Sequence, residues 1–300
     1  MQTSRKAIAL LITMMFVIVI SVAIGYGLKQ INTASQSVKD ENFMYQTSLL
    51  SEDVLKILQN SRDLQNIADS NDSIDELNIF LSTAEMIPFS VSGIDVMIHI
   101  HSARAKYNPR DLNNSLQAHY LKSYLMKNMI NIEYVNILLD SVSGIKEDNS
   151  YNSAIFERNP QLFRDYIASY RQLEKINDFY MQEYNDNSLK KVDFKNLFYF
   201  SKDTNTSIDL NYATAEVWEM MLGCEPQRAL ELHENGGIYT SKEDLNLNEE
   251  EKLRLSKYRT SFFEPYLQID VELSQNGSSA SISFEYDIKK KRGSNFVYEI

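Results

Sequence analysis

The sequence has very little of what most enzymes and disulfide-stabilised domains need. It contains one cysteine, Cys224, so an intramolecular disulfide is excluded and the redox compartment cannot be inferred from bridges. The motifs G-x-S-x-G, H-E-x-x-H and G-x-x-x-x-G-K-[ST] are absent, and no pair of carboxylates stands out by its spacing. We therefore expect that the chain is not an enzyme, and we predict no catalytic residue.

An excess of positive charge is also missing. The chain has 30 basic and 41 acidic residues, a formal net charge of −11, which argues against nucleic acid or an anionic lipid surface as its main partner. The clearest basic cluster, residues 289–292, precedes Gly-Ser-Asn and is most simply the exposed tip of a hairpin. A hydrophobic content of 43% is enough for a folded core, so the chain is globular.

Only one long hydrophobic run is present. The uncharged segment from Ala7 to Leu28, about 22 residues, is long enough to cross a hydrocarbon core of roughly 30 Å as a helix. It exceeds the roughly 7–15 residues of a secretory signal and lacks a small-residue cleavage site at its end. Arg5 and Lys6 precede it and only Lys29 directly follows. The positive-inside rule then predicts a single pass with a cytoplasmic N-terminus and the rest of the chain exported.

The periodicity of apolar residues changes along the exported part. Residues 29–69 contain no proline or glycine and have helical spacing, so the spanning helix is predicted to continue to the polar segment 69–76. Residues 93–103 alternate with a period of two, which predicts a half-buried strand. Helical spacing rich in tyrosine and phenylalanine follows over 113–257, and after Ser261 the period of two returns as three strands separated by two turns. This order is typical of an α+β protein.

Candidate metal ligands are few. His99 and His101 lie on one face of the predicted strand, but no third ligand has a recognisable spacing, so an exposed strand face is favoured. Asp203, Asn205 and Asp209 alternate as the oxygen ligands of calcium loops do. The central glycine is missing and Thr214 stands where the closing acidic residue belongs, which excludes an EF-hand and leaves a looser calcium site. Residues 69–75 repeat the pattern with equally little support.

The segment from Ser207 to Leu245 resembles a helix-hairpin-helix module in its frame. DNA-binding modules of this kind have a Gly-x-Gly hairpin whose backbone amides approach phosphate. Here the hairpin is Gly223-Cys224-Glu225, and residues 207–258 carry 5 basic and 11 acidic residues, a net of 5 − 11 = −6. The sequence therefore predicts the module without its DNA chemistry and no nucleic-acid partner. The residues that carry the frame are Leu210, Asn211, Ala213, Thr214, Glu216 and Gly223.

Taken together, the sequence resembles the K-class minor pseudopilins of type II secretion, the general secretion pathway protein K family. The phrase from Ile208 to Val217 matches the family's Ile-Asn-Val-Asn-Thr-Ala-Pro-Ala-Glu-Val pattern at most positions. Ala9-Leu10-Leu11 matches the Ala-Leu-Leu that follows the family's processing site, and residues 105–108 resemble its Gly-Lys-hydrophobic-Asn turn.

The resemblance implies a pilin-like α+β fold: a long N-terminal helix and a small antiparallel sheet, interrupted by a large all-helical insertion with a helix-hairpin-helix (SAM-like) module. The expected parts are a leader (1–7), a transmembrane assembly helix (8–28), the periplasmic helix and first strand (29–108), the insertion (109–258, with the module at 207–245) and the terminal strands (259–300).

The resemblance also implies how the chain is processed and what it does. A prepilin peptidase would cut between Ala7 and Ile8, where the family normally has glycine before the cut, and the new terminus would be methylated. Ile12 replaces the glutamate that most pilin-like subunits carry as fifth mature residue, a departure known in this family. The implied protein lies in the bacterial inner membrane with its bulk in the periplasm. It joins other minor pseudopilins and the major pseudopilin, and caps and initiates the pseudopilus. Calcium is a ligand of some family members; no other cofactor is expected.

Three alternatives stay open at this stage. A minor pilin of a type IV pilus has nearly the same sequence features. A single-pass receptor or adhesin accounts for the anchor and the amphipathic helix, although only six residues precede the span. A membrane-anchored helix-hairpin-helix protein that binds DNA requires the Gly-x-Gly hairpin and a basic face, and both are missing.

Overall fold

The computed structural model describes residues 48–70, 73–91, 94–204, 206–275 and 278–299. The chain divides into two compact units, residues 1–54 and 55–300. The predicted leader, the predicted membrane helix and the processing residues Ala7 and Ile8 lie outside the described residues. Among the helices that are described, none combines the length and the apolar character needed to span a membrane.

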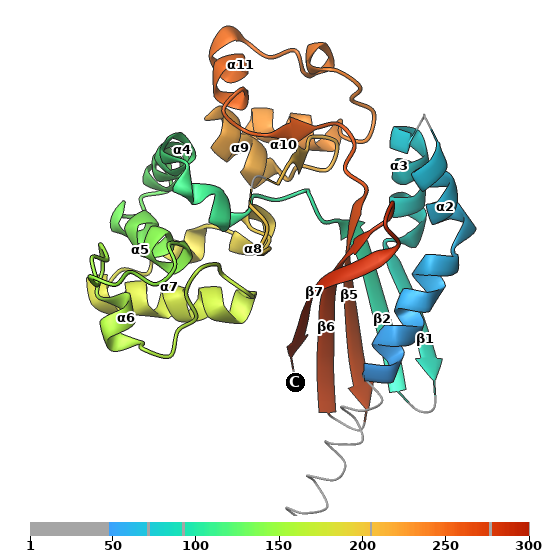
Figure 1. Ribbon diagram of the computed structural model, residues 1–300. Helices are drawn as coiled ribbons and strands as arrows, with labels where there is room; N and C mark the ends of the chain where they lie inside the picture. The colour runs from blue at the N-terminus through green and yellow to red at the C-terminus, as the bar shows by residue number, and fades with distance from the viewer. Residues whose placement is uncertain (1–47, 71–72, 92–93, 205, 276–277, 300) are drawn as a thin grey trace, which may run out of the picture. The chain divides into compact units, whose positions relative to one another are not determined.

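An antiparallel sheet of five strands is the frame of the second unit (Figure 1). The strands lie in the order β1-β2-β5-β6-β7, and each neighbouring pair is antiparallel. β2 and β5 are neighbours although a long insertion separates them in sequence. The three C-terminal strands predicted from the period of two are confirmed. The strands are β1 (Met86–Val91), β2 (Ile94–Ser102), β5 (Tyr266–Gln275), β6 (Ser278–Asp287) and β7 (Arg292–Glu299).

The alternation of side chains gives the sheet one apolar and one polar face. In β2, Val96, Ile98 and Ile100 are buried while the residues between them are more exposed. β5 continues the apolar face with alternate residues from Leu267 to Leu273, all buried. The strand predicted over residues 93–103 is therefore confirmed. His101, on the opposite face, belongs to the side of the sheet that meets the insertion.

β1 was not predicted, because Pro88 interrupts its short apolar run. The amide of Ile100 donates to the carbonyl of Glu85 (3.2 Å). Hydrogen-bonded and non-bonded pairs alternate in an antiparallel ladder, so Pro88, opposite Met97, has its nitrogen on the free edge of the sheet. A proline there costs no hydrogen bond, which is why an edge strand tolerates it.

The helices before the sheet correct a second expectation. The sequence predicts one helix through to Asp69, but residues 48–60 and α2 (Arg62–Asp69) are separate helices. Ser61 has an extended backbone, and its hydroxyl accepts from the amide of Leu64 (3.4 Å), as expected of an N-cap serine. α3 (Ser73–Ala84), which packs on β2, was also missed because its first residues form a polar string that was interpreted as a helix end.

The insertion between β2 and β5 is mostly helical. The prediction omitted a two-stranded parallel pair, β3 (Ile208–Asp209) with β4 (Thr260–Ser261), which joins its beginning to its return. Within the described residues, the other elements of the insertion are α-helices and short 3₁₀ helices. They are η1 (Pro109–Asn113), α4 (Ser115–Lys127), α5 (Glu133–Val142), α6 (Ile155–Arg158), α7 (Tyr170–Tyr184), η2 (Ser188–Lys191), α8 (Phe194–Leu197), α9 (Ala215–Leu222), α10 (Pro226–Glu234), η3 (Lys242–Leu245) and α11 (Glu249–Leu255).

The insertion has a hydrophobic core of its own. Trp218, Tyr134 and Tyr180 are fully buried in it, and Tyr134 and Tyr180 meet edge to face with ring centroids 5.3 Å apart. Phe179 is buried, whereas Tyr184 stacks on Tyr180 and keeps 37% of its surface exposed. These aromatic residues therefore serve packing within the insertion.

Candidate functional site at the junction of the sheet and the insertion

Two stretches of chain connect the sheet with the insertion, and they are bonded to each other. The amide of Ala103, just after β2, donates to the carbonyl of Tyr266 at the start of β5 (2.9 Å). The next residue, Arg104, accepts at its carbonyl from the amide of Asp209 in β3 (2.9 Å). The outgoing and returning chains are thus tied together at the point where the insertion begins.

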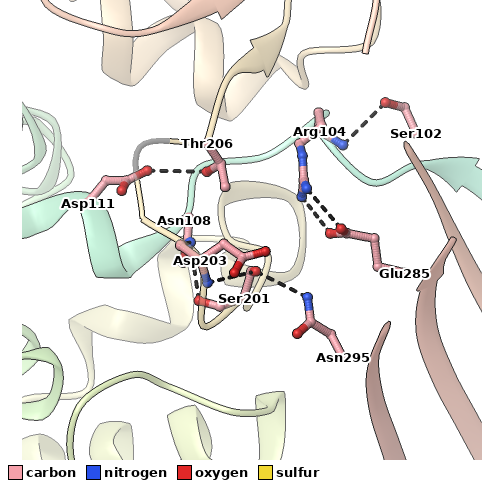
Figure 2. A network of polar contacts seen from close by, with 9 residues as sticks. All are labelled: Ser102, Arg104, Asn108, Asp111, Ser201, Asp203, Thr206, Glu285 and Asn295. Atoms are coloured by element: carbon pink, nitrogen blue, oxygen red, sulfur yellow. Dashed lines mark hydrogen bonds and ion pairs between the residues drawn. The ribbon is translucent and has the colours of Figure 1, made fainter. Parts of the chain in front are cut away.

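A buried ion pair fixes this crossing to the sheet (Figure 2). The guanidinium of Arg104 donates two hydrogen bonds to the carboxylate of Glu285 on β6, at 2.5 and 2.8 Å, and each residue is only 4% exposed. The guanidinium also lies over the ring of Tyr266, 4.3 Å from its centroid. Burial by itself lowers the pKa of Arg104, but neighbouring Tyr199 and Glu285 outweigh it, so the pKa lies above its ordinary value. Burial raises the pKa of Glu285, against the opposing effect of the Arg104 charge and its hydrogen bonds.

A second polar network ties the loop after α8 to the same crossing (Figure 2). The side-chain amide of Asn108 donates to the carbonyls of Ser201 (3.2 Å) and Asp203 (2.8 Å). The Ser201 hydroxyl oxygen accepts from the amide of Asp203 and from the side chain of Asn295 on β7, both at 3.1 Å. The sheet, the outgoing chain and the interior of the insertion are therefore linked through the buried residues Asn108 and Ser201.

A third contact joins the insertion to α3. Gly237, in the loop after α10, has φ +88°, and a Cβ there would lie 2.8 Å from the side chain of Asn78. The positive φ favours glycine, and a larger residue would also have to displace the Asn78 side chain. With the two networks above, the contact holds the insertion to the sheet-bearing part at separate points, which favours one fixed orientation.

A cleft of about 240 Å³ opens beside these contacts on the polar face of the sheet. His101 of β2 lines it, with Nδ1 3.7 Å from Oδ2 of Asp270. Burial lowers the pKa of His101 to about 4 despite the opposing charge of Asp270, so this histidine is neutral at pH 7. Within the described residues, no group of three histidine, cysteine or acidic side chains could hold a metal ion.

The segment from Ile208 to Val217, which carried the sequence resemblance, holds other parts of the chain together through hydrogen bonds of Asn211, which we call the Asn211 clasp. Asn211 donates through its side-chain amide to the carbonyls of Tyr239 (2.9 Å) and Phe262 (2.7 Å), and accepts from the amide of Tyr239 (2.8 Å). Thr214 caps α9 by accepting from the amide of Val217 (3.3 Å). The phrase therefore joins the loop after α10 to the returning chain. Its remaining members are Leu210 and Ala213, both buried, and Glu216, which is partly exposed in the first turn of α9.

Cationic side chains of the insertion itself cover the hairpin between α9 and α10. Gly223 ends α9 with φ +68°, and a Cβ there would lie 2.6 Å from Cζ of Arg254. That guanidinium donates to the last carbonyls of α9 (3.2 Å each), and Lys127 Nζ donates to the carbonyl of Cys224 (2.9 Å). A phosphate would have to displace Arg254 to reach this hairpin. Whether the segment is a true helix-hairpin-helix module stays a prediction.

The predicted calcium ligands lie in different environments. Asp209 is fully buried, and its two carboxylate oxygens accept from the amides of Asn211 (3.0 Å) and Glu264 (2.9 Å). Asp203 is exposed, and Asn205 lies outside the described residues. Calcium binding stays a prediction.

Replacing Asp209 with asparagine should change how stability depends on pH. Burial raises the pKa of Asp209 to about 7, against 3.8 when exposed, so the folded state holds the proton more tightly. Wild-type stability should therefore fall as pH rises between these values, by about 1.4 kcal/mol per pH unit from this group alone. The neutral asparagine does not ionise. We expect the variant to gain stability relative to wild type from pH 4 to pH 7, measured by denaturant unfolding. A difference that stays constant with pH would contradict this.

The sequence matches no protein-family model and no curated protein. Among solved structures, it is similar to a chain of the GspK-GspI-GspJ complex from the enterotoxigenic Escherichia coli type 2 secretion system, with a TM-score of 0.51. The two chains share a fold. They are 12% identical, and the alignment covers 87% of this chain and 97% of that one. Neither the sheet-bearing part nor the insertion alone amounts to such a share, so the similarity includes both.

Sequence reasoning missed the residues that hold this shared fold together. Arg104 and Glu285 are 181 positions apart, and alternation places Glu285 on the polar face of β6, where no burial is expected. Arg254 lies on a short helix with three consecutive glutamates at its start and looks solvent-exposed in sequence. The one available signal was that residues 105–108, next to Arg104, resemble a family turn.

Proposed function

We propose that the chain is a K-class minor pseudopilin of a type II secretion system. The observation that carries the proposal is the fold shared with a chain of the GspK-GspI-GspJ complex over both the sheet-bearing part and the insertion. The N-terminal apolar run and the phrase from Ile208 to Val217 support the same conclusion independently of the fold. In this role the chain is not an enzyme; it acts by assembly.

The role has a physical basis in the anchor and the insertion. The apolar helix of residues 8–28 would hold the subunit in the inner membrane until neighbouring apolar helices replace lipid. An insertion fixed to the sheet by the Arg104–Glu285 pair would occupy the space that a further subunit needs, which supports a place at the tip. The proposed partners are the counterparts of GspI and GspJ, the major pseudopilin and the prepilin peptidase.

The proposed processing is tested by the intact mass and N-terminal sequence of the chain purified from native membranes. We expect the chain to begin at methylated Ile8 in cells with prepilin peptidase and at Met1 in cells without it. A chain that begins at Met1 in both strains refutes the pseudopilin mechanism and brings the receptor alternative forward.

The tip position needs a separate measurement. In cells that overproduce pseudopili, antibody labelling of the chain should mark one end of each filament. Labelling along the whole filament would contradict the capping role while leaving the pseudopilin assignment intact.

A further inference from the structure

A partly buried lysine without a counterion lies beside the junction. Lys106 follows β2 and lines the cleft described above. Within the described ranges, its ammonium makes no hydrogen bond or ion pair with another residue. Burial lowers its pKa, while Asp270, Asp193 and Glu216 oppose the shift from beyond contact distance. A cation withdrawn from water and left unpaired costs free energy, so its natural complement is an anion.

A second lysine lines the same cleft. Lys195, an exposed residue of α8, makes no hydrogen bond or ion pair through its ammonium within the described part of the chain. Neutral His101 and the hydroxyl side chain of Ser281 also line the cleft.

The acidic residues of the cleft limit the charge of what it can hold. Glu285 is saturated by Arg104, and Asp270 already accepts from Ser283 and from Gln268. The carboxyl groups of Asp270 and Glu299 nevertheless lie in the wall of the cleft. A phosphate with about two charges would be repelled by them, whereas a carboxylate has one charge and accepts several hydrogen bonds.

We propose that the cleft binds a carboxylate group between Lys106 and Lys195, brought either by a small free acid or by an aspartate or glutamate side chain of a partner polypeptide. This site is independent of the assembly role, because it depends only on the junction. In either case the carboxylate supplies the counterion that Lys106 lacks, and its second oxygen accepts from Lys195.

The test measures binding of three probes to the full-length chain in a nonionic detergent by ligand-observed NMR, at constant ionic strength. The probes are sodium acetate, the blocked tripeptide Ac-Ala-Asp-Ala-NH₂ and its neutral match Ac-Ala-Asn-Ala-NH₂. The variants are Lys106→Met and Lys195→Met, each of which keeps an apolar stem. Lys252→Met is the matched control, since Lys252 is exposed and paired with Glu249 on α11.

We expect acetate or the aspartate peptide to bind, and the asparagine peptide not to bind. Lys106→Met and Lys195→Met should each weaken binding about tenfold, and Lys252→Met should leave it unchanged. Tighter binding of the peptide than of acetate identifies a polypeptide as the source; the reverse identifies a free acid. The proposal is overturned if neither carboxylate probe binds, if the asparagine peptide binds equally well, or if Lys106→Met has no effect. None of these outcomes bears on N-terminal processing, so failure here is distinguishable from failure of the proposed function.

Discussion

Replacing Arg104 with methionine is expected to lower the free energy of unfolding by about 3–5 kcal/mol, because it leaves the Glu285 carboxylate buried without a partner. Methionine keeps an apolar stem against Tyr266, so the loss reports chiefly on the charge. The measurement is urea unfolding followed by the fluorescence of Trp218, the only tryptophan, which is fully buried in the core of the insertion. Far-UV circular dichroism follows the remaining structure in the same samples.

The double variant Arg104→Met/Glu285→Leu separates the cost of an orphaned charge from the value of the pair. Because replacing both members of a buried pair by apolar residues is often nearly neutral, it should recover most of the lost stability. Lys252→Met, at an exposed pair, should have no measurable effect. If the double variant is no more stable than Arg104→Met, the pair is not acting as an isolated charge pair and this account of the junction is wrong.

Replacing Gly236 with alanine should have a comparable effect for a purely steric reason. A Cβ at this position would lie 2.3 Å from the carbonyl oxygen of Asn211 and 3.0 Å from that of His233. Both are backbone atoms held by their own contacts, so the clash cannot be relieved by turning a side chain. We expect a loss of about 3 kcal/mol or more, together with loosening of the Asn211 clasp.

Gly144→Ala is the matched control, because it tests backbone conformation without a clash. Gly144 has φ +77°, and the nearest atom to a new Cβ is 3.9 Å away. A left-handed alanine costs about 1–2 kcal/mol, less than the expected loss at Gly236. Urea unfolding of both variants gives the comparison. Equal losses at the two positions would mean that the loop around Gly236 moves aside more easily than the structure indicates.

The parts of the fold that the sequence predicts are those that follow from local periodicity. Val96, Ile98 and Ile100 alternate without interruption, and so do the residues of β5 and β6, because one face of each strand is buried along its whole length. β1 escaped prediction since an edge strand tolerates Pro88, and the helix break at Ser61 escaped since a single serine produces it. Local periodicity does not predict features of this kind, because a single residue determines each of them.

The junction was beyond sequence reasoning for a different reason. Its bonds join residues that are distant in the chain, such as Asn295 to Ser201, and each residue type is ordinary in its local segment. The residues that were singled out, Asn211 and Thr214 among them, turned out to hold loops together rather than to face solvent. A phrase that resembles a family pattern can be preserved by packing alone, and that explains how it pointed to the correct fold without locating a binding site.

The insertion leaves and rejoins the sheet at residues that are paired with each other. Ser102 and Leu267 face each other in the paired strands β2 and β5. A tight hairpin turn can connect residues so placed without changing the register on either side. A two-residue turn from Ser102 to Leu267 would keep the pairing of β2 with β5, but it would also remove Arg104 and leave Glu285 without its partner. The insertion therefore supplies a residue that the sheet itself needs.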